Sequence, residues 1–324
     1  MSSPVIPLSS LAIKIPKVQK VKDVDDFDIN SDDLPLGIKL TGGLKLRRDG
    51  LTGKGVRVAV IDSGVDSNHS GFSGRVTKQM WFRYGTPLSE DDHGTHVAGT
   101  IHMMAPDAEI YDYRVFGDEG FDVDEAISIS ILEACFDGCD IINMSLGGRF
   151  ASSGIRTAVQ YAHSKGVIVV CAAGNEGDDN PLTNERSFPA LWEEAICVAA
   201  VSKKKRLPVA YFSNSNPHVD YSGIGVDVVS FKPDGGFQQM NGTSMACPHV
   251  CGFLTALLDK ENGYLSAVEA GSKDKPVKGD KYLRKLINEK YVIDIGVKGP
   301  DNETGLGFLT YLNKKEFKRL WEGN

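Results

Sequence analysis

Five short apolar runs, separated by segments with helical spacing, constrain the fold of this chain more than any other feature. Apolar side chains at helical spacing also mark residues 123–138 and 152–166, and both segments end at glycine, a usual helix terminator. Strands that are apolar almost throughout need cover on both faces. The alternation therefore predicts an α/β fold of three layers, with a doubly wound, mostly parallel sheet flanked by helices. The apolar runs are 56–62, 108–116, 140–146, 167–173 and 195–201.

The amino-terminal region differs from the rest of the chain. Residues 1–34 combine a proline-punctuated apolar start, several lysines and the acidic run DVDDFDINSDD. This composition is typical of an extension rather than of a packed core. We therefore expect an N-terminal extension over residues 1–34 and one folded domain over residues 35–324.

Charge and composition exclude several classes of function. The chain has 36 basic and 43 acidic residues, and its densest basic cluster, 203–206, is too short to follow a phosphate backbone. No run reaches the roughly 20 apolar residues that span a bilayer, and the first twenty residues lack a secretory signal pattern. The six cysteines lie mainly in apolar runs, as reduced buried thiols do. We expect a cytoplasmic protein that binds neither nucleic acid nor membrane.

Four polar residues occupy places where chemistry would be expected. Asp62 closes the first apolar run and Asn175 follows the fourth, while His93 lies in DDHGTHVAGTI and Ser244 in NGTSMACPHVCG. Taken singly, each suits an ordinary role in a turn, a close-packed helix or a helix start. Open parallel sheets, however, gather their chemistry beyond the carboxyl ends of the strands. We therefore expect the four side chains to meet at that edge.

Together these residues supply the parts of a nucleophilic hydrolase. Such chemistry needs a hydroxyl, a base, a carboxylate that orients the base, and a donor for the oxyanion. Ser244, His93, Asp62 and Asn175 provide one of each. The pair formed by His93 and His96 lacks the glutamate of the zinc-peptidase motif, so a metal pair is the weaker interpretation.

The segments around these residues resemble a known family. VAVIDSGVD, HGTHVAGTI, NMSLGG, AAGNEG and NGTSMACPHV are similar, in order and spacing, to the signature segments of the subtilisin-like serine peptidases, over residues 35–312. The resemblance implies a serine endopeptidase with a Ser-His-Asp triad of Ser244, His93 and Asp62, an acyl-enzyme, and Asn175 in the oxyanion hole. LPLGIKL, VCAAGNEGDD, SFPALWEEAI and GLGFLTYL are similar to stretches of the intracellular branch of that family.

The intracellular branch also implies an inhibitory segment. Its short extension carries an apolar-Ile-Pro-aromatic motif that lies across the active site, and Val5, Ile6, Pro7 and Leu8 resemble this motif with leucine in place of the aromatic residue. Proline fixes φ and has no N–H, so such a segment can fill a substrate groove while misplacing the peptide bond. We predict that residues 1 to about 20 keep a zymogen inactive until they are cut, with a frayed terminus as the competing interpretation.

The resemblance implies how substrate binds. An extended peptide would pair with the main chain of two stretches, a mode that tolerates many sequences, and a pocket would hold the side chain before the cut. Acidic residues at 118, 119, 122 and 124 leave open either a preference for basic side chains or a merely solvated face. The main-chain stretches are Gly120, Phe121, Asp122 and Ser145, Leu146, Gly147; the pocket residues are Ala172, Ala173, Gly174 and Ser187, with Glu176 at the rim.

No cofactor is expected to be required for the chemistry. The family's strong calcium site is expected to be absent, because its ligand loop after HGTHVAGTI is missing and Gly71 stands where the family has aspartate. A weaker structural cation site at Ala190, Trp192 and Asp227 stays open, as does a homodimer. Protein or peptide substrates are the expected partners.

Two alternative functions remain to be weighed. Transfer of the acyl group to an amine would give peptide ligation, but no large shielding insertion is visible. A catalytically silent binding protein would use the same fold, but the complete catalytic set argues against it.

Overall fold

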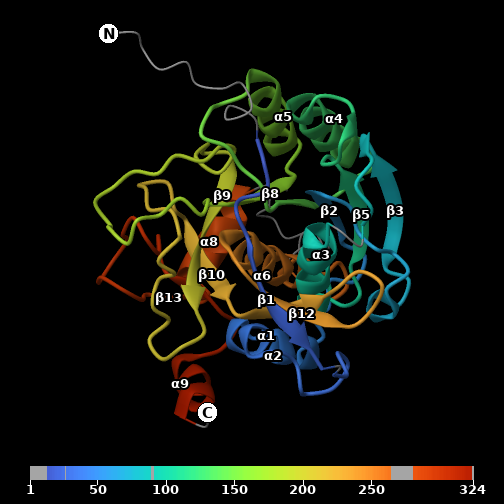
Figure 1. The fold of residues 1–324 in the computed structure, drawn as a ribbon. Helices are drawn as coiled ribbons and strands as arrows, with labels where there is room; N and C mark the ends of the chain where they lie inside the picture. The colour runs from blue at the N-terminus through green and yellow to red at the C-terminus, as the bar shows by residue number, and fades with distance from the viewer. Residues whose placement is uncertain (1–12, 26, 89–90, 264–279, 323–324) are drawn as a thin grey trace, which may run out of the picture.

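The computed structural model describes residues 13–25, 27–88, 91–263 and 280–322, and the predicted motif at residues 5–8 lies outside them. Its centre is a nine-stranded sheet (Figure 1). The strands are β2 Arg57–Asp62, β3 Val76–Trp81, β5 Glu109–Arg114, β7 Ile141–Met144, β8 Ile168–Ala172, β9 Ala195–Ser202, β10 Tyr221–Val226, β13 Val292–Ile293 and β14 Phe308–Leu309. Their order is β13-β14-β10-β9-β8-β7-β2-β5-β3, and every neighbouring pair is parallel except β13 with β14.

Helices cover both faces of this sheet. They are α1 Leu36–Thr41, α2 Gly43–Arg48, α3 His93–Met104, α4 Val123–Phe136, α5 Ser153–Ser164, α6 Thr243–Leu257, α8 Asp280–Lys290 and α9 Lys314–Glu322, with a short 3₁₀ helix at Ser70–Phe72. Val58 and Val60 of β2 belong to the core on the α3 and α6 side. Ala59 and Ile61 belong to the core that includes α4 and α5. Alternate residues of one strand thus feed two cores, as the three-layer prediction requires.

Helices on the two faces differ in their burial. α5 buries Ile155, Ala158, Val159 and Ala162, one stripe of an amphipathic helix, whereas α3 and α6 are buried at every residue. Small residues permit this close packing. A Cβ added at Gly94 of α3 would lie 2.3 Å from the carbonyl oxygen of Gly64, which no side chain could accept.

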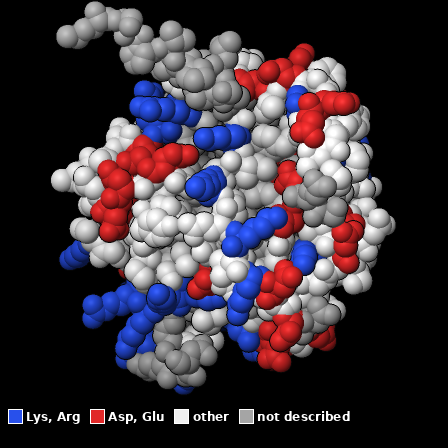
Figure 2. Space-filling model, viewed as in Figure 1, with Lys and Arg blue, Asp and Glu red and all other residues white. Residues whose placement is uncertain are grey.

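Two small sheets complete the fold. β1 Gln19–Val24, β12 Phe237–Asn241 and β11 Val228–Phe231 form an antiparallel sheet, and β4 Arg83–Tyr84 pairs with β6 Glu119–Gly120. β1 crosses the face of the molecule on which α3 and α6 lie, and both acidic and basic side chains gather at the centre of that face (Figures 1 and 2).

The predicted fold class is confirmed. Each of the five apolar runs is a strand of the central sheet, and the two helical segments are α4 and α5. The sequence patterns did not predict β3, β10 or the small antiparallel sheet. No helix within the described residues has the length and hydropathy needed to cross a bilayer.

Candidate active site

Asp62 and His93 meet at the carboxyl edge of the sheet. Asp62 is the last residue of β2 and is fully buried, and His93 is the first residue of α3. The Asp62 Oδ1 atom lies 2.7 Å from His93 Nδ1 and also accepts a 2.7 Å hydrogen bond from the backbone N–H of Ser63. The Nε2 atom of His93 is buried and has no hydrogen-bond partner among the described residues. This nitrogen is therefore available to take a proton.

Opposing effects set the pKa of His93. Burial alone lowers it, but the charge of Asp62, its hydrogen bond, and the charges of Asp91 and Asp92 together raise the pKa above its ordinary value. Burial, followed by the nearby charge of Asp62, raises the pKa of Asp91. The sequence reasoning did not single out Asp91 or Asp92; two carboxylates directly before the base were the available signal.

Ser244 lies at the start of α6, beyond the same edge of the sheet. Its hydroxyl donates a 3.0 Å hydrogen bond to the carbonyl of Ser145, and the Ser145 hydroxyl donates a 2.9 Å bond to the carbonyl of Ser244. Pro248 explains the second bond. In a regular helix the residue four positions after Ser244 donates its N–H to the Ser244 carbonyl. That residue is Pro248, which has no N–H, so the Ser244 carbonyl can accept the hydrogen bond from Ser145 instead.

Asn175 completes the group. Its Oδ1 atom accepts 2.8 Å hydrogen bonds from both the N–H and the hydroxyl of Thr243, which orients the amide so that Nδ2 is the free donor. That Nδ2 donates a 3.0 Å hydrogen bond to the carbonyl oxygen of Lys17. A carbonyl therefore already lies at the predicted oxyanion donor.

The carbonyl belongs to residues 13–24, here called the covering segment. Lys14 and Gly147 exchange two backbone hydrogen bonds of 3.1 and 2.9 Å, and further along Gln19 pairs with Asn241 in the β1–β12 ladder. Ile13 is 2% exposed and anchors the segment in the core that includes α4 and α5. The segment crosses the candidate site between these two pairings, where the Lys17 carbonyl contacts Asn175. The Ile-Pro pair found here is Ile15-Pro16, whereas the predicted Ile6-Pro7 lies outside the described residues.

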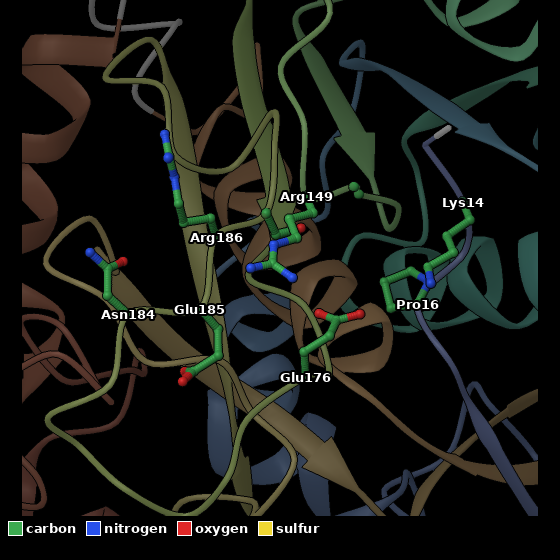
Figure 3. Close-up of a pocket in the computed structure, with 10 residues that line it drawn as sticks. Lys14, Pro16, Arg149, Glu176, Asn184, Glu185 and Arg186 are labelled. Atoms are coloured by element: carbon green, nitrogen blue, oxygen red, sulfur yellow. The ribbon is translucent and has the colours of Figure 1, made fainter. Parts of the chain in front are cut away.

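A cavity of about 390 Å³ adjoins this crossing (Figure 3). It brings together the predicted Gly147, Glu176 and Ser187, together with residues that the sequence reasoning missed. In Figure 3, Arg149 and Glu176 extend toward each other across the cavity, whereas Arg186 points away from it. Two of the lining residues, Ser187 and Glu176, are those predicted for the pocket, and its rim, that would hold the side chain before the cut. The additional lining residues are Lys14, Pro16, Gly148, Arg149, Asn184, Glu185 and Arg186.

The other predicted substrate residues lie on strand ends and turns. Ser145 and Leu146 follow β7, and Ala172, Ala173 and Gly174 end or follow β8, with Gly174 donating to the Thr243 hydroxyl at 3.2 Å. Gly120 belongs to β6, while Asp122 caps α4 by accepting the Asp124 N–H. Phe121 is 47% exposed. Over the described parts of both segments, no hydrogen bond joins residues 120–122 to the covering segment.

Asp227, one of the predicted ligands of a weak cation site, has other contacts. The Asp227 carboxylate accepts a 2.6 Å hydrogen bond from Gln239, and the Asp227 carbonyl accepts one from Lys203. Within the described ranges, no three His, Cys, Asp or Glu side chains are grouped as a metal site would require.

Comparison with known proteins gives consistent results. The subtilase family model matches residues 53–307. The major intracellular serine protease of Bacillus subtilis (strain 168) is 37% identical over 251 residues, which cover 72% of this chain and 77% of that protein. Subtilisin E of the same strain is 35% identical over 264 residues, covering 78% and 68%, and the intracellular serine protease of Paenibacillus polymyxa is 36% identical over 225 residues, covering 65% and 68%. The chain therefore belongs to the subtilase family and is a serine endopeptidase.

Proposed function

We propose that this endopeptidase attacks peptide bonds through Ser244, with His93 as general base, Asp62 orienting the imidazole and Asn175 stabilising the oxyanion. The observation that carries this proposal is the 2.7 Å contact between Asp62 and His93 at one strand end, beside the Ser244 helix start. His93 Nε2 would take the serine proton and return it to the leaving amine. Water would then hydrolyse the acyl-enzyme.

The resting hydroxyl suggests how attack begins. Ser244 donates to the Ser145 carbonyl rather than to His93. An extended substrate that places a main-chain N–H at the Ser145 carbonyl would compete for this acceptor. The displaced hydroxyl could then rotate toward the unpartnered His93 Nε2. Substrate binding would in this way complete the hydrogen bond between nucleophile and base.

Ser244→Ala tests the assignment of the nucleophile. We expect hydrolysis of casein and of peptides to fall by several orders of magnitude, because the variant keeps the fold but has no hydroxyl to acylate. Ser153→Ala, on the solvent side of α5's start, is the matched control and should retain its rate. Peptide hydrolysis that survives Ser244→Ala would refute the assignment.

We also propose that the covering segment, rather than residues 5–8 alone, keeps the enzyme inactive. The two backbone pairings and the Asn175 contact to Lys17 support this proposal, because a substrate needs the same main-chain groups. Pro16 offers no N–H to the groove and restricts the backbone immediately before Lys17. The segment would bind like a substrate while its peptide bonds stay out of line with Ser244.

Ile13→Asp in the full chain tests this inhibition. Burying an isoleucine contributes about 2–3 kcal/mol, and a buried aspartate would cost more, so peptide hydrolysis should rise at least about tenfold. A chain that begins at Asp32 should be as active or more active. The exposed Val21→Asp serves as the control with little change. If neither Ile13→Asp nor the shortened chain exceeds the full chain, the segment does not inhibit.

Further proposals concern specificity, metals and location. Main-chain recognition at Gly147 favours broad specificity, which profiling on peptide libraries would measure.

We propose that catalysis needs no metal, so that dialysis against EDTA leaves the initial rate unchanged. The names of two relatives support a cytoplasmic location, which cell fractionation would test. A homodimer stays a prediction for sedimentation measurements.

A further inference from the structure

One ion pair joins the covering segment to the residue before the catalytic histidine. Lys20 Nζ lies 2.8 Å from Asp92 Oδ2. The Lys20 side chain is 59% exposed, whereas that of Asp92 is only 9% exposed. Asp92 stands at the N-cap position of α3, yet its side chain makes no capping hydrogen bond. Its carboxylate is thus directed away from its own helix and toward the substrate path.

The position of Lys20 can be counted from the catalytic residues. The carbonyl of Lys17 meets Asn175 Nδ2, and Lys20 is the third residue beyond it. Gln19 and Lys20 pair in antiparallel register with Asn241 and Met240, which immediately precede the α6 start. The Lys17 carbonyl takes the place of the carbonyl of the cut bond. A substrate that runs in the same direction would therefore place its third residue after the cut bond where Lys20 now lies.

The side of the strand is also determined. Successive side chains of an extended segment point to opposite faces, so Val18 and Lys20 share one face. Val18 packs against the core on the α3 and α6 side. Its Cγ2 atom would lie 3.5 Å from a Cβ added at Gly242. The face that carries Val18 and Lys20 is therefore turned toward the enzyme. A side chain at the Lys20 position reaches Asp92 rather than solvent alone.

We propose that Asp92 is a specificity-determining residue for the leaving side of the substrate, selecting lysine or arginine at the third residue after the scissile bond. This inference rests on the proposed function, in which the covering segment occupies the substrate path. Once the segment leaves, the Asp92 carboxylate loses its cation, and a substrate with a basic side chain restores the pair. A neutral side chain there leaves the charge unpaired, and an acidic one repels it.

Matched peptides test the proposal in the full-length Ile13→Asp chain. Three internally quenched peptides differ only at the third residue after the cut, which is lysine, norleucine or glutamate, and mass spectrometry verifies the cut site. The ratio of two kcat/KM values does not depend on the fraction of molecules whose segment has left, because that fraction multiplies both. We expect lysine to exceed norleucine about fivefold, the upper range for a partly exposed pair, and glutamate to be slowest.

Variants then assign the preference to one carboxylate. Asp92→Asn should bring the lysine-to-norleucine ratio to about 1, whatever it does to the absolute rates through its neighbour His93. Glu119→Gln removes an exposed carboxylate of β6 and should leave the ratio unchanged. Thermal melts establish that each variant is folded. The comparison of the three peptides in the Ile13→Asp chain does not depend on Asp92→Asn or Glu119→Gln being folded.

The outcomes separate the two proposals. An active Ile13→Asp chain with equal kcat/KM for lysine and norleucine overturns the role of Asp92 and leaves the inhibition intact. Equal loss of the ratio in Asp92→Asn and Glu119→Gln also overturns it, because the preference would then reflect overall charge. If neither the Ile13→Asp chain nor the chain beginning at Asp32 is more active than the wild type, the inhibition is refuted and the basis for the role of Asp92 is removed.

Discussion

The proposed catalytic centre and the covering segment lie against each other but are built by different physical means. Asp62, His93 and Ser244 are at most 4% exposed and are held by elements buried on every side. The covering segment buries Ile13 and Pro16 and otherwise uses strand pairing and exposed or partly buried side chains. The first region cannot be altered without disturbing a core, whereas the second adds Ile13 to one core and packs Val18 and Val24 against the other, so its proposed departure would leave most of both cores in place. This contrast suits a device that must be assembled before it is released.

The largest expected effect concerns the buried centre. Asp62→Asn should lower kcat by about 10⁴-fold, because an amide cannot hold His93 in the tautomer that accepts the serine proton. Steady-state kinetics in the Ile13→Asp background measure this loss. Asp23→Asn, which removes an exposed carboxylate of the covering segment paired with Lys232, is the matched control and should change kcat less than twofold. A loss of kcat below tenfold for Asp62→Asn would contradict the view that catalysis depends on the buried centre far more than on the covering segment.

Asn175 belongs to both regions, since it contacts Thr243 in the centre and Lys17 in the segment. In a subtilisin, removal of an oxyanion donor costs about 10²–10³-fold in kcat, and we expect a loss of this order for Asn175→Ala. KM should change little, because the donor acts mainly on the transition state. An unchanged kcat would show that Asn175 serves the segment alone.

We expect the free energy of unfolding to fall in acid because two histidines are buried in the core. Burial lowers the pKa of His96 to about 3 and that of His102 to about 4. The unfolded chain therefore binds these protons first, and stability falls as pH drops from about 6.5 toward 4, by roughly 1.4 kcal/mol per pH unit for each histidine. Urea unfolding of Ser244→Ala, which cannot digest itself, measures the change. His102→Leu should reduce the loss by about 2 kcal/mol between pH 6 and 4.5, and exposed His218→Gln should not.

The smallest expected effect lies at the edge of the covering segment. The Tyr211 hydroxyl accepts a 2.8 Å hydrogen bond from Gln19. Tyr211→Phe removes about 0.5–1 kcal/mol at an exposed site, so basal peptide hydrolysis by the full chain should rise about twofold to fivefold. The same substitution in a chain beginning at Asp32 should have no effect. A gain in both chains would place Tyr211 with the catalytic centre rather than the segment.

The same contrast explains what could be predicted from the sequence. Asp62 and Asn175 follow apolar runs, so periodicity locates the strand ends on which they lie. β3, with sequence VTKQMW, has no such pattern because four of its side chains are only partly buried and two are exposed. The covering segment follows no core periodicity either. The family motif indicates Ile6-Pro7, whereas Ile15-Pro16 is flanked by lysines and does not match that motif. The contacts of Ile15-Pro16 with the site follow from the pairings of Lys14 and Gln19, which no sequence pattern predicts. Arg149 reaches the cavity through side-chain geometry, which no spacing rule predicts.

The proline within α6 determines which part of the molecule sets the position of the nucleophile. A helix with a complete hydrogen-bond ladder moves as one rod, so a shift at its far end reaches its first turn. In α6 the ladder is open at the Ser244 carbonyl, and the Ser145 hydroxyl holds that carbonyl instead. Ser145 follows β7, a neighbour of both β2 and β8, whose ends lead to Asp62 and Asn175. The positions of Ser244, Asp62 and Asn175 are thus all set by the central sheet. Substitutions that repack the distal end of α6 should therefore leave these three side chains aligned.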